Sequence, residues 1–385
     1  MNTNTHSGEI ILDNAHIVLD EEVIHGHIVL RDGHITAIGT GRSTSPAAQD
    51  LEGDHLVPGL IEVHTDNVER HLVPRPGVRW PTMPGILAHD SDIISAGITT
   101  VLDAVACGSD YGKEYRRDIC EAAVAGITEA RDAGYLRAEH LLHLRCEIAA
   151  EDMADTFARC IDSDMVKLVS IMDHTPGARQ FTDLDKFAEY YKGKHGVNDQ
   201  QLAEMIEKRK EIQARLGPRH RDQVVSGARE RGITLASHDD ATLEHIEEAV
   251  ELGVTISEFP TTVEAAEAAH RHGLATIMGA PNMVRGKSHS GNIAARELAQ
   301  LGLLDVFSSD YVPVSLMQAA WLLHEQSGYS LPDAFRVVSG NPARLLGLAD
   351  RGSIAQDKRA DVVRVRRTPH GAVVRRVWKE GRQVA

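Results

Sequence analysis

The chain has 385 residues, and 41 lysines and arginines against 56 aspartates and glutamates give a formal net charge of −15. A chain of this length can bury a large core, either as one barrel or as two domains. The acidic balance argues against non-specific binding to nucleic acid. No apolar run reaches the roughly 18 residues that predict a membrane-spanning helix.

The N-terminal residues and the cysteines indicate the cellular compartment in which the protein works. The first ten residues, MNTNTHSGEI, lack the basic and apolar segments of a signal peptide. The four cysteines form no CxxC pair, so they predict neither a disulfide framework nor a zinc knuckle. We therefore expect a reduced, cytoplasmic protein with no membrane or nucleic-acid partner. We also expect a homo-oligomer, whose size the sequence does not specify.

Short segments of alternating apolar residues predict β-strands at both ends of the chain. They lie in residues 9–57 and 353–385 and are separated by Gly and Asp turns. Neither set is large enough to bury a core by itself. We therefore expect residues 1–57 and 353–385 to pair into one small β-sandwich domain.

Between the two ends, apolar and β-branched runs alternate with helical stretches. Eight such runs occur, at 60–64, 98–107, 141–147, 165–174, 233–238, 254–258, 275–281 and 305–310. The segments between most of them carry apolar residues at the spacing of an amphipathic helix. Eight strand–helix units predict an α/β fold, a (β/α)8 TIM-type barrel over residues 58–352. A doubly wound sheet is the alternative, but no GxGxxG motif follows an early strand.

The segment 175–232 is too long to be a simple connection between the fourth and fifth strands. Its charged sequence predicts two or three helices inserted at the active end of the barrel. This insertion is either a lid over the site or a solvated excursion without substrate contact, and the sequence leaves both open.

Residues that can bind a metal follow six of the eight predicted strands. After the first strand, His64 and Asp66 project to the same side because strand side chains alternate. By itself this pair more often indicates a buried histidine bonded to an aspartate in a turn. The other strand ends carry Glu147, Asp173, His174, His238 with Asp239 and Asp240, Glu258 and Asp310. Because barrel chemistry occurs at the carboxyl ends of the strands, the set as a whole predicts a metal site.

The predicted ligands supply only nitrogen and oxygen atoms. We expect them to be His64, Asp66, Glu147, His238 and Asp310, with His174 and Glu258 as further candidates. Such a set suits Zn²⁺, Mn²⁺, Fe²⁺ or Co²⁺ and, with this many carboxylates, also Mg²⁺. One or two divalent ions are expected, and Glu147 could bridge two of them.

Several motifs resemble those of the amidohydrolase superfamily. They are the HxD after the first strand, His238, Asp310 and the closing segment 341–363, NPARLLGLADRGSIAQDKRADVV. Members usually carry HxH after the first strand and a histidine after the sixth, where this chain has Asp66 and Glu258. Longer motifs, including SIMDHTPGARQF, ASHDDAT and GAPNMVRGKSHSGN, resemble one branch of the superfamily over roughly residues 10–380.

That resemblance implies an anionic sugar triphosphate as the substrate. The branch hydrolyses α-D-ribose 1-methylphosphonate 5-triphosphate to the 5-phosphate and pyrophosphate, in phosphonate catabolism through carbon–phosphorus lyase. A polyanion requires cations and hydrogen-bond donors around it. We expect these from Arg179, Asn282, Arg285, Lys287, His289, Ser290 and Asn292, with Lys192 and Lys194 of the insertion as further candidates. Read alone, the loop RGKSHSG is equally consistent with a flexible basic loop.

The resemblance also implies a mechanism, with Asp310 and His174 as the catalytic residues. Water attacks the α-phosphorus, and Asp310 accepts its proton as the general base. His174, His289 or a lysine assists the leaving group. Two other functions stay open: a deaminase or cyclic-amide hydrolase on the same scaffold, and a non-catalytic scaffold.

Overall fold

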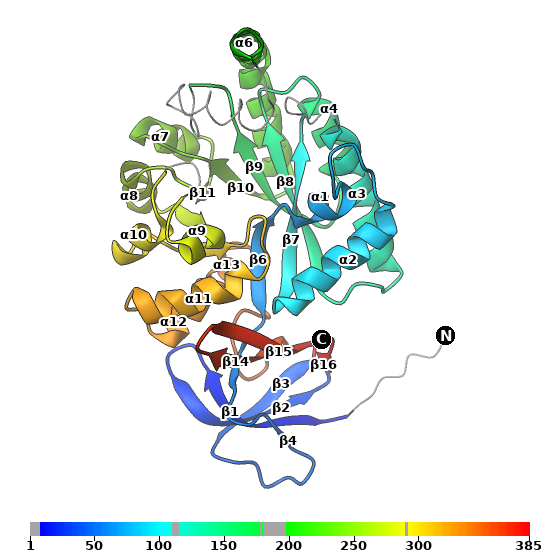
Figure 1. The fold of residues 1–385 in the computed structure, drawn as a ribbon, viewed down its shortest axis with the longest axis vertical. Helices are drawn as coiled ribbons and strands as arrows, with labels where there is room; N and C mark the ends of the chain where they lie inside the picture. Colours follow the sequence, from blue (N-terminus) through cyan, green and yellow to red (C-terminus); the bar gives the residue numbers. More distant parts are fainter. Residues whose placement is uncertain (1–7, 110–114, 178, 180–197, 289–291) are drawn as a thin grey trace.

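The strands that the structure describes form two separate sheets (Figure 1). The computed structural model describes residues 8–109, 115–177, 179, 198–288 and 292–385. One sheet combines strands from both ends of the chain, and the other is the central barrel. Both were predicted from the sequence, and the barrel with its separate terminal sheet is confirmed.

The terminal sheet has the strand order β16-β15-β14-β5-β1-β2-β3, with β4 beside β1. Its strands are β1 (Ile10–Val18), β2 (Val23–Arg31), β3 (His34–Thr40), β4 (Gln49–Asp50), β5 (His55–Pro58), β14 (Val362–Thr368), β15 (Gly371–Lys379) and β16 (Arg382–Gln383). The two ends of the chain meet where β5 pairs antiparallel with β14 and Val57 lies opposite Val363. Alternate residues such as Leu12, Ile28 and Trp378 are fully buried in its own apolar cluster.

The second sheet has eight parallel strands in chain order, β6 to β13. They are β6 (Leu60–Thr65), β7 (Ile98–Cys107), β8 (Glu139–Glu147), β9 (Val166–Met172), β10 (Thr234–His238), β11 (Ile256–Glu258), β12 (Ala275–Gly279) and β13 (Val306–Ser308). A parallel bridge between Thr65 and Asp310 brings the last strand back to the first. Each strand overlaps one of the eight predicted runs.

Gly59 marks the passage from one sheet to the other. It lies between β5 and β6, and its N–H donates to the carbonyl of Asp361 at 2.8 Å. A Cβ at this position would lie 2.3 Å from the hydroxyl oxygen of Thr99. The chain therefore needs a glycine where it passes this close to β7.

The inside of the barrel is filled by one apolar layer to which every strand contributes a residue. The layer consists of Val63, Leu102, Leu141, Leu168, Ala236, Ile256, Ile277 and Val306. Because side chains alternate along a strand, the residue two positions further on points to the same side. For Leu141, Ala236 and Ile256, those residues are His143, His238 and Glu258. The apolar layer is thus the floor of a polar chamber.

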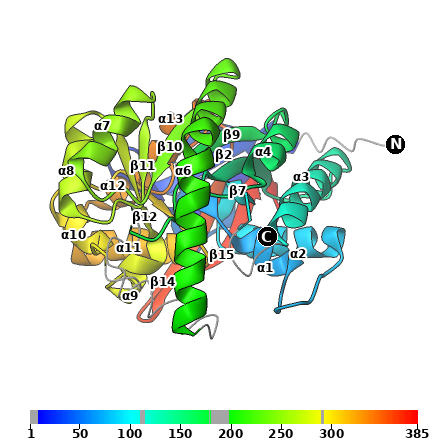
Figure 2. The same cartoon turned by 90° about the horizontal axis from the view of Figure 1, so that it is seen from above.

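Helices cover the outside of the barrel (Figures 1 and 2). They are α1 (Asn67–Leu72), α2 (Thr82–Ser95), α3 (Arg116–Asp132), α4 (Met153–Cys160), α6 (Asp199–Glu230), α7 (Leu243–Glu251), α8 (Val263–Arg271), α9 (Ala280–Arg285), α10 (Ala295–Gln300), α11 (Ser315–Gln326), α12 (Leu331–Arg336) and α13 (Gly340–Leu345). Threonine caps begin two of them: Thr242 accepts from the His245 N–H, and Thr262 accepts from the Ala265 N–H. No helix in the described part of the chain is both long and apolar enough to cross a membrane.

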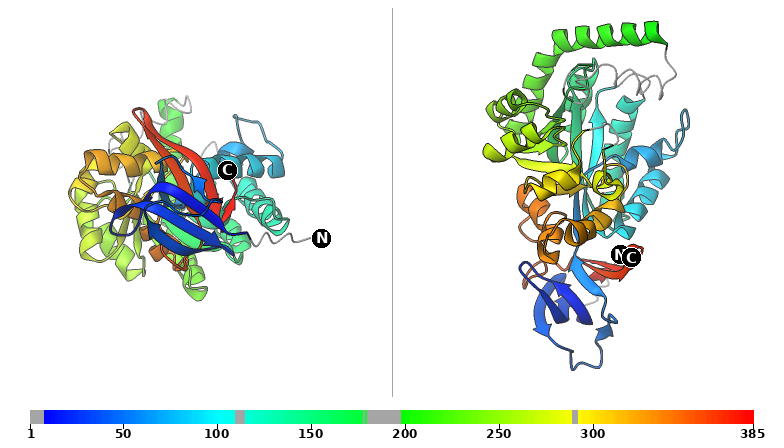
Figure 3. Two further views of the ribbon diagram at one scale, coloured as in Figure 1. Left: turned by 90° about the horizontal axis from the view of Figure 1, so that it is seen from below. Right: turned by 60° about the vertical axis from the view of Figure 1, so that its left-hand side comes forward.

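The described part of the predicted insertion contains the 32-residue helix α6. A capping box at Asn198 and Gln201 begins it. Its C-terminal part packs against the barrel through Val224 and Ala228. The right-hand view of Figure 3 shows α6 as a bent helix at the top of the molecule, and Pro218 inside it is a residue type that kinks helices.

The two sheets are also the basis for dividing the chain into domains. We propose a β-sandwich domain of residues 1–57 and 353–385 and a barrel domain of residues 58–352. The junctions lie at Gly59, between β5 and β6, and before β14.

Candidate metal site at the mouth of the barrel

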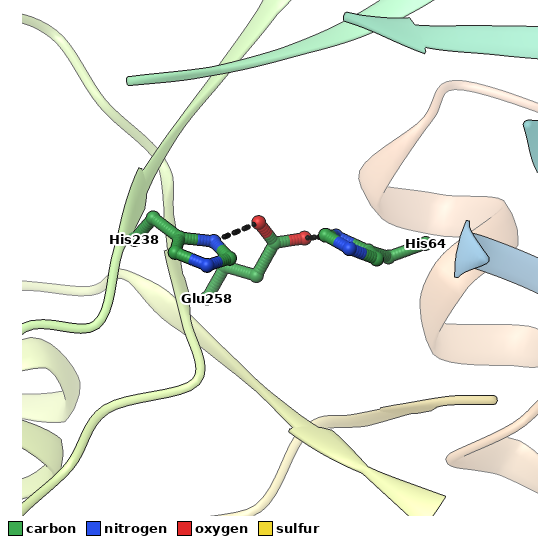
Figure 4. Close-up of side chains that lie close together, drawn as sticks. All are labelled: His64, His238 and Glu258. Carbon is green, nitrogen blue, oxygen red and sulfur yellow. Dashed lines mark hydrogen bonds and ion pairs between the residues drawn. The ribbon is translucent and has the colours of Figure 1, made fainter. Parts of the chain in front are cut away.

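Glu258 joins two buried histidines above the floor of the barrel. The Nδ1 atom of His64 lies 2.6 Å from Glu258 Oε1, and the Nδ1 atom of His238 lies 2.7 Å from Oε2 (Figure 4). All three side chains are almost fully buried. Since a carboxylate only accepts, each Nδ1 donates its proton to Glu258. The Nε2 atom of each ring is therefore the nitrogen that Glu258 does not occupy.

His174 is held in the same way by a second buried glutamate. Its Nδ1 lies 2.5 Å from Glu147 Oε2, and its backbone N–H donates to Oε1 at 3.2 Å. The guanidinium of Arg209 lies 3.4 Å from the same Oε1 atom. Glu147 therefore orients His174, as Glu258 orients the other two rings.

The three outward ring nitrogens face aspartates at distances too long for a hydrogen bond. His64 Nε2 lies 3.7 Å from Asp66 Oδ1, and His238 Nε2 and His174 Nε2 lie 3.5 and 3.6 Å from Asp239 Oδ2. Two ligand atoms about 2.1 Å from one ion lie roughly 3.4 Å apart in tetrahedral geometry. These gaps therefore have the width that a shared divalent ion requires.

Asp239 provides a second sign that this chamber fits a cation. Its Oδ2 atom is buried and has no hydrogen-bond partner within the described residues. An unsatisfied buried carboxylate oxygen is costly unless a cation or another donor approaches it. His174, His238 and Asp239 thus form a group whose ligand atoms lie close enough together to hold one ion.

Asp66 and Asp310 lie on the side of His64, where the barrel closes. The Asp66 N–H donates to the Asp310 carbonyl at 2.8 Å, and the Asp310 N–H donates to the His64 carbonyl at 3.1 Å. Arg145 donates to the Asp66 carboxylate. Burial and the charge of Asp66 raise the pKa of Asp310 to about 6. This carboxyl group is therefore poised between its two protonation states near neutral pH.

The charges of the other groups follow from their pairing. Burial alone would lower the pKa of His174, but the negative charges of Glu147 and Asp239 raise it to about 9. Burial alone would raise the pKa of Glu147, but His174 and Arg209 hold it at about 2. The pKa of Glu258 is held well below its usual range by His64 and His143 against the effect of burial. Without an added cation, His174 and His64, whose pKa values the neighbouring carboxylates raise, are therefore drawn towards the protonated form.

Backbone strain is concentrated at the same strand ends. Asp239, Phe259 and Asp310 have positive φ angles of 54°, 56° and 53°, although none is a glycine. Each follows its strand within two residues, and the Phe259 ring packs edge-on against His64 and His238. Such conformations cost on the order of 1–3 kcal/mol and persist where the surroundings enforce them, often at functional sites.

The predicted metal and catalytic residues lie together, whereas two of the predicted substrate-binding residues, Arg179 and Asn282, have partners elsewhere. His64, Asp66, His174, His238, Glu258, Glu147 and Asp310 all lie at the barrel mouth. Arg179 instead pairs with Asp240 and with Glu248, 3.0 Å away. Asn282 uses its amide to brace the following loop, with bonds to Ile293 and Ala295.

The rest of the predicted phosphate loop is only partly described. Arg285 and Lys287 are exposed, and Asn292 is half-buried. His289 and Ser290, like Lys192 and Lys194 of the insertion, lie outside the described residues. Their roles in binding substrate stay predictions.

The sequence analysis named Asp239 among the strand-end residues but not among the predicted ligands, and it did not select Arg145 or Arg209. A signal existed for the first two: Asp239 directly follows the strand-end His238, and Arg145 lies two residues before Glu147 on the same face of β8. Arg209 lies in the middle of a charged helix. No spacing rule connects it with a strand that ends more than fifty residues earlier, at Glu147.

Comparisons with known proteins agree with this architecture. The profile of the Amidohydrolase family matches residues 55–384. Alpha-D-ribose 1-methylphosphonate 5-triphosphate diphosphatase from Escherichia coli is 45% identical over 377 residues, which cover 97% of this chain and 100% of that protein. The solved structure of 5-methylcytosine deaminase from Klebsiella pneumoniae has a TM-score of 0.64 at 14% identity and covers 98% of this chain and 97% of that chain.

A second solved structure, N-acetylglucosamine-6-phosphate deacetylase from Pasteurella multocida, has a TM-score of 0.62 at 14% identity and covers 98% of this chain and all of that chain. At such identities, the structural likeness bears on the fold alone. The family profile and the full-length relative carry more weight because they match the sequence itself. The chain therefore belongs to the amidohydrolase family.

Proposed function

We propose that this chain is a phosphoanhydride hydrolase that converts α-D-ribose 1-methylphosphonate 5-triphosphate to the 5-phosphate and pyrophosphate in phosphonate catabolism. The observation that carries the proposal is the 45% identity, along 97% of the chain, to an enzyme whose name states this activity. The chamber supports it because its histidines and acids suit a reaction that needs cations beside a water and a phosphoryl group.

The proposed cofactor is one or two divalent ions, of Zn, Mn, Fe, Co or Mg. The nitrogens of His174 and His238 and the unsatisfied oxygen of Asp239 would hold one, and His64, Asp66 and Asp310 would hold a second or share the first. When bound, such an ion lowers the pKa of a water molecule and polarises phosphoryl oxygens. Glu147 and Glu258 orient the ligands, since each accepts from an Nδ1 proton.

In the proposed reaction, Asp310 accepts the proton of the attacking water. A carboxylate at the end of β13 beside His64 is within the same chamber as the proposed ions, so it can accept a proton from a water held there. The left-handed backbone at Asp310 and its bonds to the end of β6 fix this carboxylate beside His64. The Asp310 carboxylate is therefore held in one orientation in which it can accept the proton of the water.

His174 cannot serve both as a ligand and as the acid for the leaving group, because its Nε2 atom would be needed for each role. Its Nδ1 atom is occupied by Glu147. We assign it to the ligand role, since its Nε2 atom and that of His238 face the same oxygen of Asp239. Pyrophosphate can depart without an acid where cations stabilise its charge.

The decisive experiment follows phosphorus NMR signals of purified protein with the ribosyl triphosphate and added Mn²⁺ or Zn²⁺, using an amide substrate and an ammonia readout in parallel. We expect signals of pyrophosphate and of the 5-phosphate, and no ammonia. Release of ammonia or acid from the amide, without pyrophosphate, would instead assign the chain to the deaminase or cyclic-amide chemistry of its fold. The cytoplasmic location and the homo-oligomeric assembly stay predictions.

A further inference from the structure

The long helix α6 extends across the end of the barrel where the strand ends gather. Figure 2, which looks down on the molecule, shows α6 lying in front of the strands β7, β9 and β10. Its C-terminal part is anchored, since Val224 and Ala228 are buried and His220 bonds to the carbonyl of Ile148 at 3.0 Å. The rest of the helix is thus held over the mouth by packing.

Two side chains of α6 reach down to acids at the strand ends. Arg209 lies 3.4 Å from Glu147, and only 11% of its side chain is exposed. Gln213, one turn further on, donates to the carboxylate of Asp173 at 3.2 Å. Residues four apart lie on the same face of a helix, so these two form one polar patch that faces the site.

The neighbours of Arg209 on the helix do not share this environment. Lys208 and Lys210 are exposed, and Lys210 has an ion pair with Glu207 at 3.8 Å on the outer face. Burial therefore selects Arg209 from a run of three cations. A long cationic side chain loses more conformational entropy and hydration here than at the surface, so its position calls for an explanation.

Electrostatics supplies a reason for a cation at this place. Glu147, Asp173 and Asp239 line this side of the mouth. A substrate with a triphosphate would be repelled by these carboxylates unless cations flank both ends of its phosphate chain. Metal ions at the histidines would lie at one end of such a chain, beside the phosphate that reacts.

Pairing with an acid is common to Arg209 and to other described cations near the mouth, so position and burial distinguish Arg209 from them. Arg145 donates to Asp66, and Arg179 pairs with Asp240 and Glu248. Arg285 and Lys287 are exposed on the loop after β12. Arg209 combines partial burial with a position at the edge of the metal chamber, joined to it through Glu147 and His174.

We propose that Arg209 is a substrate-binding residue that contacts the phosphates which leave as pyrophosphate, with Gln213 beside it as a neutral donor. This inference rests on the proposed function, because it assigns the leaving group to the side of the mouth beneath α6. Arg209 offers a planar fork of donors that suits phosphate oxygens, which a lysine does not match. Glu147 keeps its guanidinium pointed towards the chamber.

The test compares how variants of metal-loaded enzyme bind two ligands by calorimetry: inorganic pyrophosphate, which is a product, and ribose 5-phosphate, which is an analogue of the other product. We expect Arg209→Gln to weaken pyrophosphate binding roughly 10- to 100-fold, the usual effect of losing a charged hydrogen bond. Binding of ribose 5-phosphate should change less than about threefold. The KM for the triphosphate should rise in step with the pyrophosphate dissociation constant, and kcat should change less.

Lys208→Gln is the matched control, because it removes the same charge from an exposed position of the same helix. It should leave both affinities within about twofold. Arg209→Lys keeps the charge without the fork and should recover part of the pyrophosphate affinity. It also keeps the test meaningful if Arg209→Gln does not fold.

The proposal would be overturned if Arg209→Gln lowered the affinities for pyrophosphate and ribose 5-phosphate equally. It would also be overturned if Arg209→Gln and Lys208→Gln had equal effects. A fall in bound metal or in melting temperature with unchanged pyrophosphate affinity would assign Arg209 to holding Glu147 in place. If wild-type protein does not hydrolyse the triphosphate, the proposed function fails, whereas the contrast in pyrophosphate binding still tests Arg209.

Discussion

Two buried clusters in this protein share one design, a carboxylate between two histidines, yet differ in what their outer atoms meet. At the barrel mouth, Glu258 lies between His64 and His238 at 2.6 and 2.7 Å (Figure 4). On the outer side of β7, Asp103 lies between His89 and His140 at 2.5 and 2.7 Å. Both sets are nearly inaccessible to solvent.

In the outer cluster, every ring nitrogen has a hydrogen-bond partner. His89 Nδ1 lies 3.0 Å from the amide of Asn67, and His140 Nε2 lies 3.4 Å from Asp90. His140 faces a carboxylate on each side, so both its nitrogens donate, and its pKa is raised to about 9 against the effect of burial. With Arg137 bound to Asp90 at 2.9 Å, two positive charges balance two negative ones.

In the mouth cluster, by contrast, some ring nitrogens and one carboxylate oxygen lack a close hydrogen-bond partner. The outward nitrogens of His64 and His238 face aspartates at 3.7 and 3.5 Å, and an oxygen of Asp239 has no partner within the described residues. A cluster that satisfies itself stabilises the fold, whereas one with converging unsatisfied atoms needs a further cation. The spacing of histidines and acids therefore does not identify a metal site until the partners of both ring nitrogens are known.

The largest expected effect is that of Asp239→Asn at the mouth. Asparagine tolerates the left-handed backbone at this position, so the change removes the charge and little else. We expect bound metal to fall and turnover to drop on the order of a thousand-fold, about 4 kcal/mol in the activation barrier. Metal analysis and phosphorus NMR measure both. Full metal content with normal turnover would show that the mouth cluster does not need Asp239 to bind a cation.

A substitution in the outer cluster should lower the free energy of unfolding without changing metal binding or turnover. His140→Gln leaves Asp103 and Asp90 without their shared cation, and breaking a buried ion pair costs about 3–5 kcal/mol. Denaturant unfolding should show this loss, whereas His270→Gln, at an exposed position of α8, should change stability by less than about 0.5 kcal/mol. Loss of metal from folded His140→Gln would show that the outer cluster also binds an ion.

The same cluster predicts how stability depends on pH. His140 holds its proton with a pKa of about 9 in the folded protein, against about 6.5 when unfolded. Its contribution is complete below about pH 6.5 and is lost as the pH rises through 9, up to about 3 kcal/mol. On the acid side, Asp90, with its pKa lowered to about 2, contributes above about pH 4 and loses that contribution as the pH falls towards 2.

Unfolding free energies of wild type and His140→Gln measured between pH 6 and 9.5 test this dependence. The difference between the two proteins should shrink as the pH rises. A constant difference would show that folding does not raise the pKa of His140.

The smallest effect in this series is expected for Glu258→Gln. Glutamine can accept from only one of the two Nδ1 protons, so either His64 or His238 loses its fixed orientation. Changing such an orienting residue costs about 10- to 100-fold in metal affinity or activity. Metal titration should show weaker binding with unchanged stoichiometry. A loss of one equivalent of metal at saturation would make Glu258 a ligand, and Glu264→Gln on the exposed face of α8 is the control.

The fold was largely predictable because its determinants are local. The eight runs that became β6 to β13 are continuous, apolar and regularly separated by amphipathic segments, and they pair with their neighbours in chain order. The strand ends were also readable, since His238 and Glu258 stand two residues beyond the buried floor residues Ala236 and Ile256. Family motifs added the expected chemistry, which periodicity alone does not specify.

Other features depended on contacts between distant segments. The four cysteines show no motif, yet Cys120 lies 3.8 Å from Cys107 and 3.7 Å from Cys160 in the structure. Arg209 meets Glu147 only because α6 folds back across the mouth.

The sequence by itself determined the barrel, the paired ends and the acids and histidines at the strand ends, because these follow from the alternation of side chains along each strand. Only the tertiary structure decided which nitrogen of each histidine is occupied, that Asp239 has an unsatisfied oxygen, and that His89, Asp103 and His140 form a closed network. The reason is that hydrogen-bond satisfaction is a property of all the atoms around a group, and those atoms come from segments far apart in the chain.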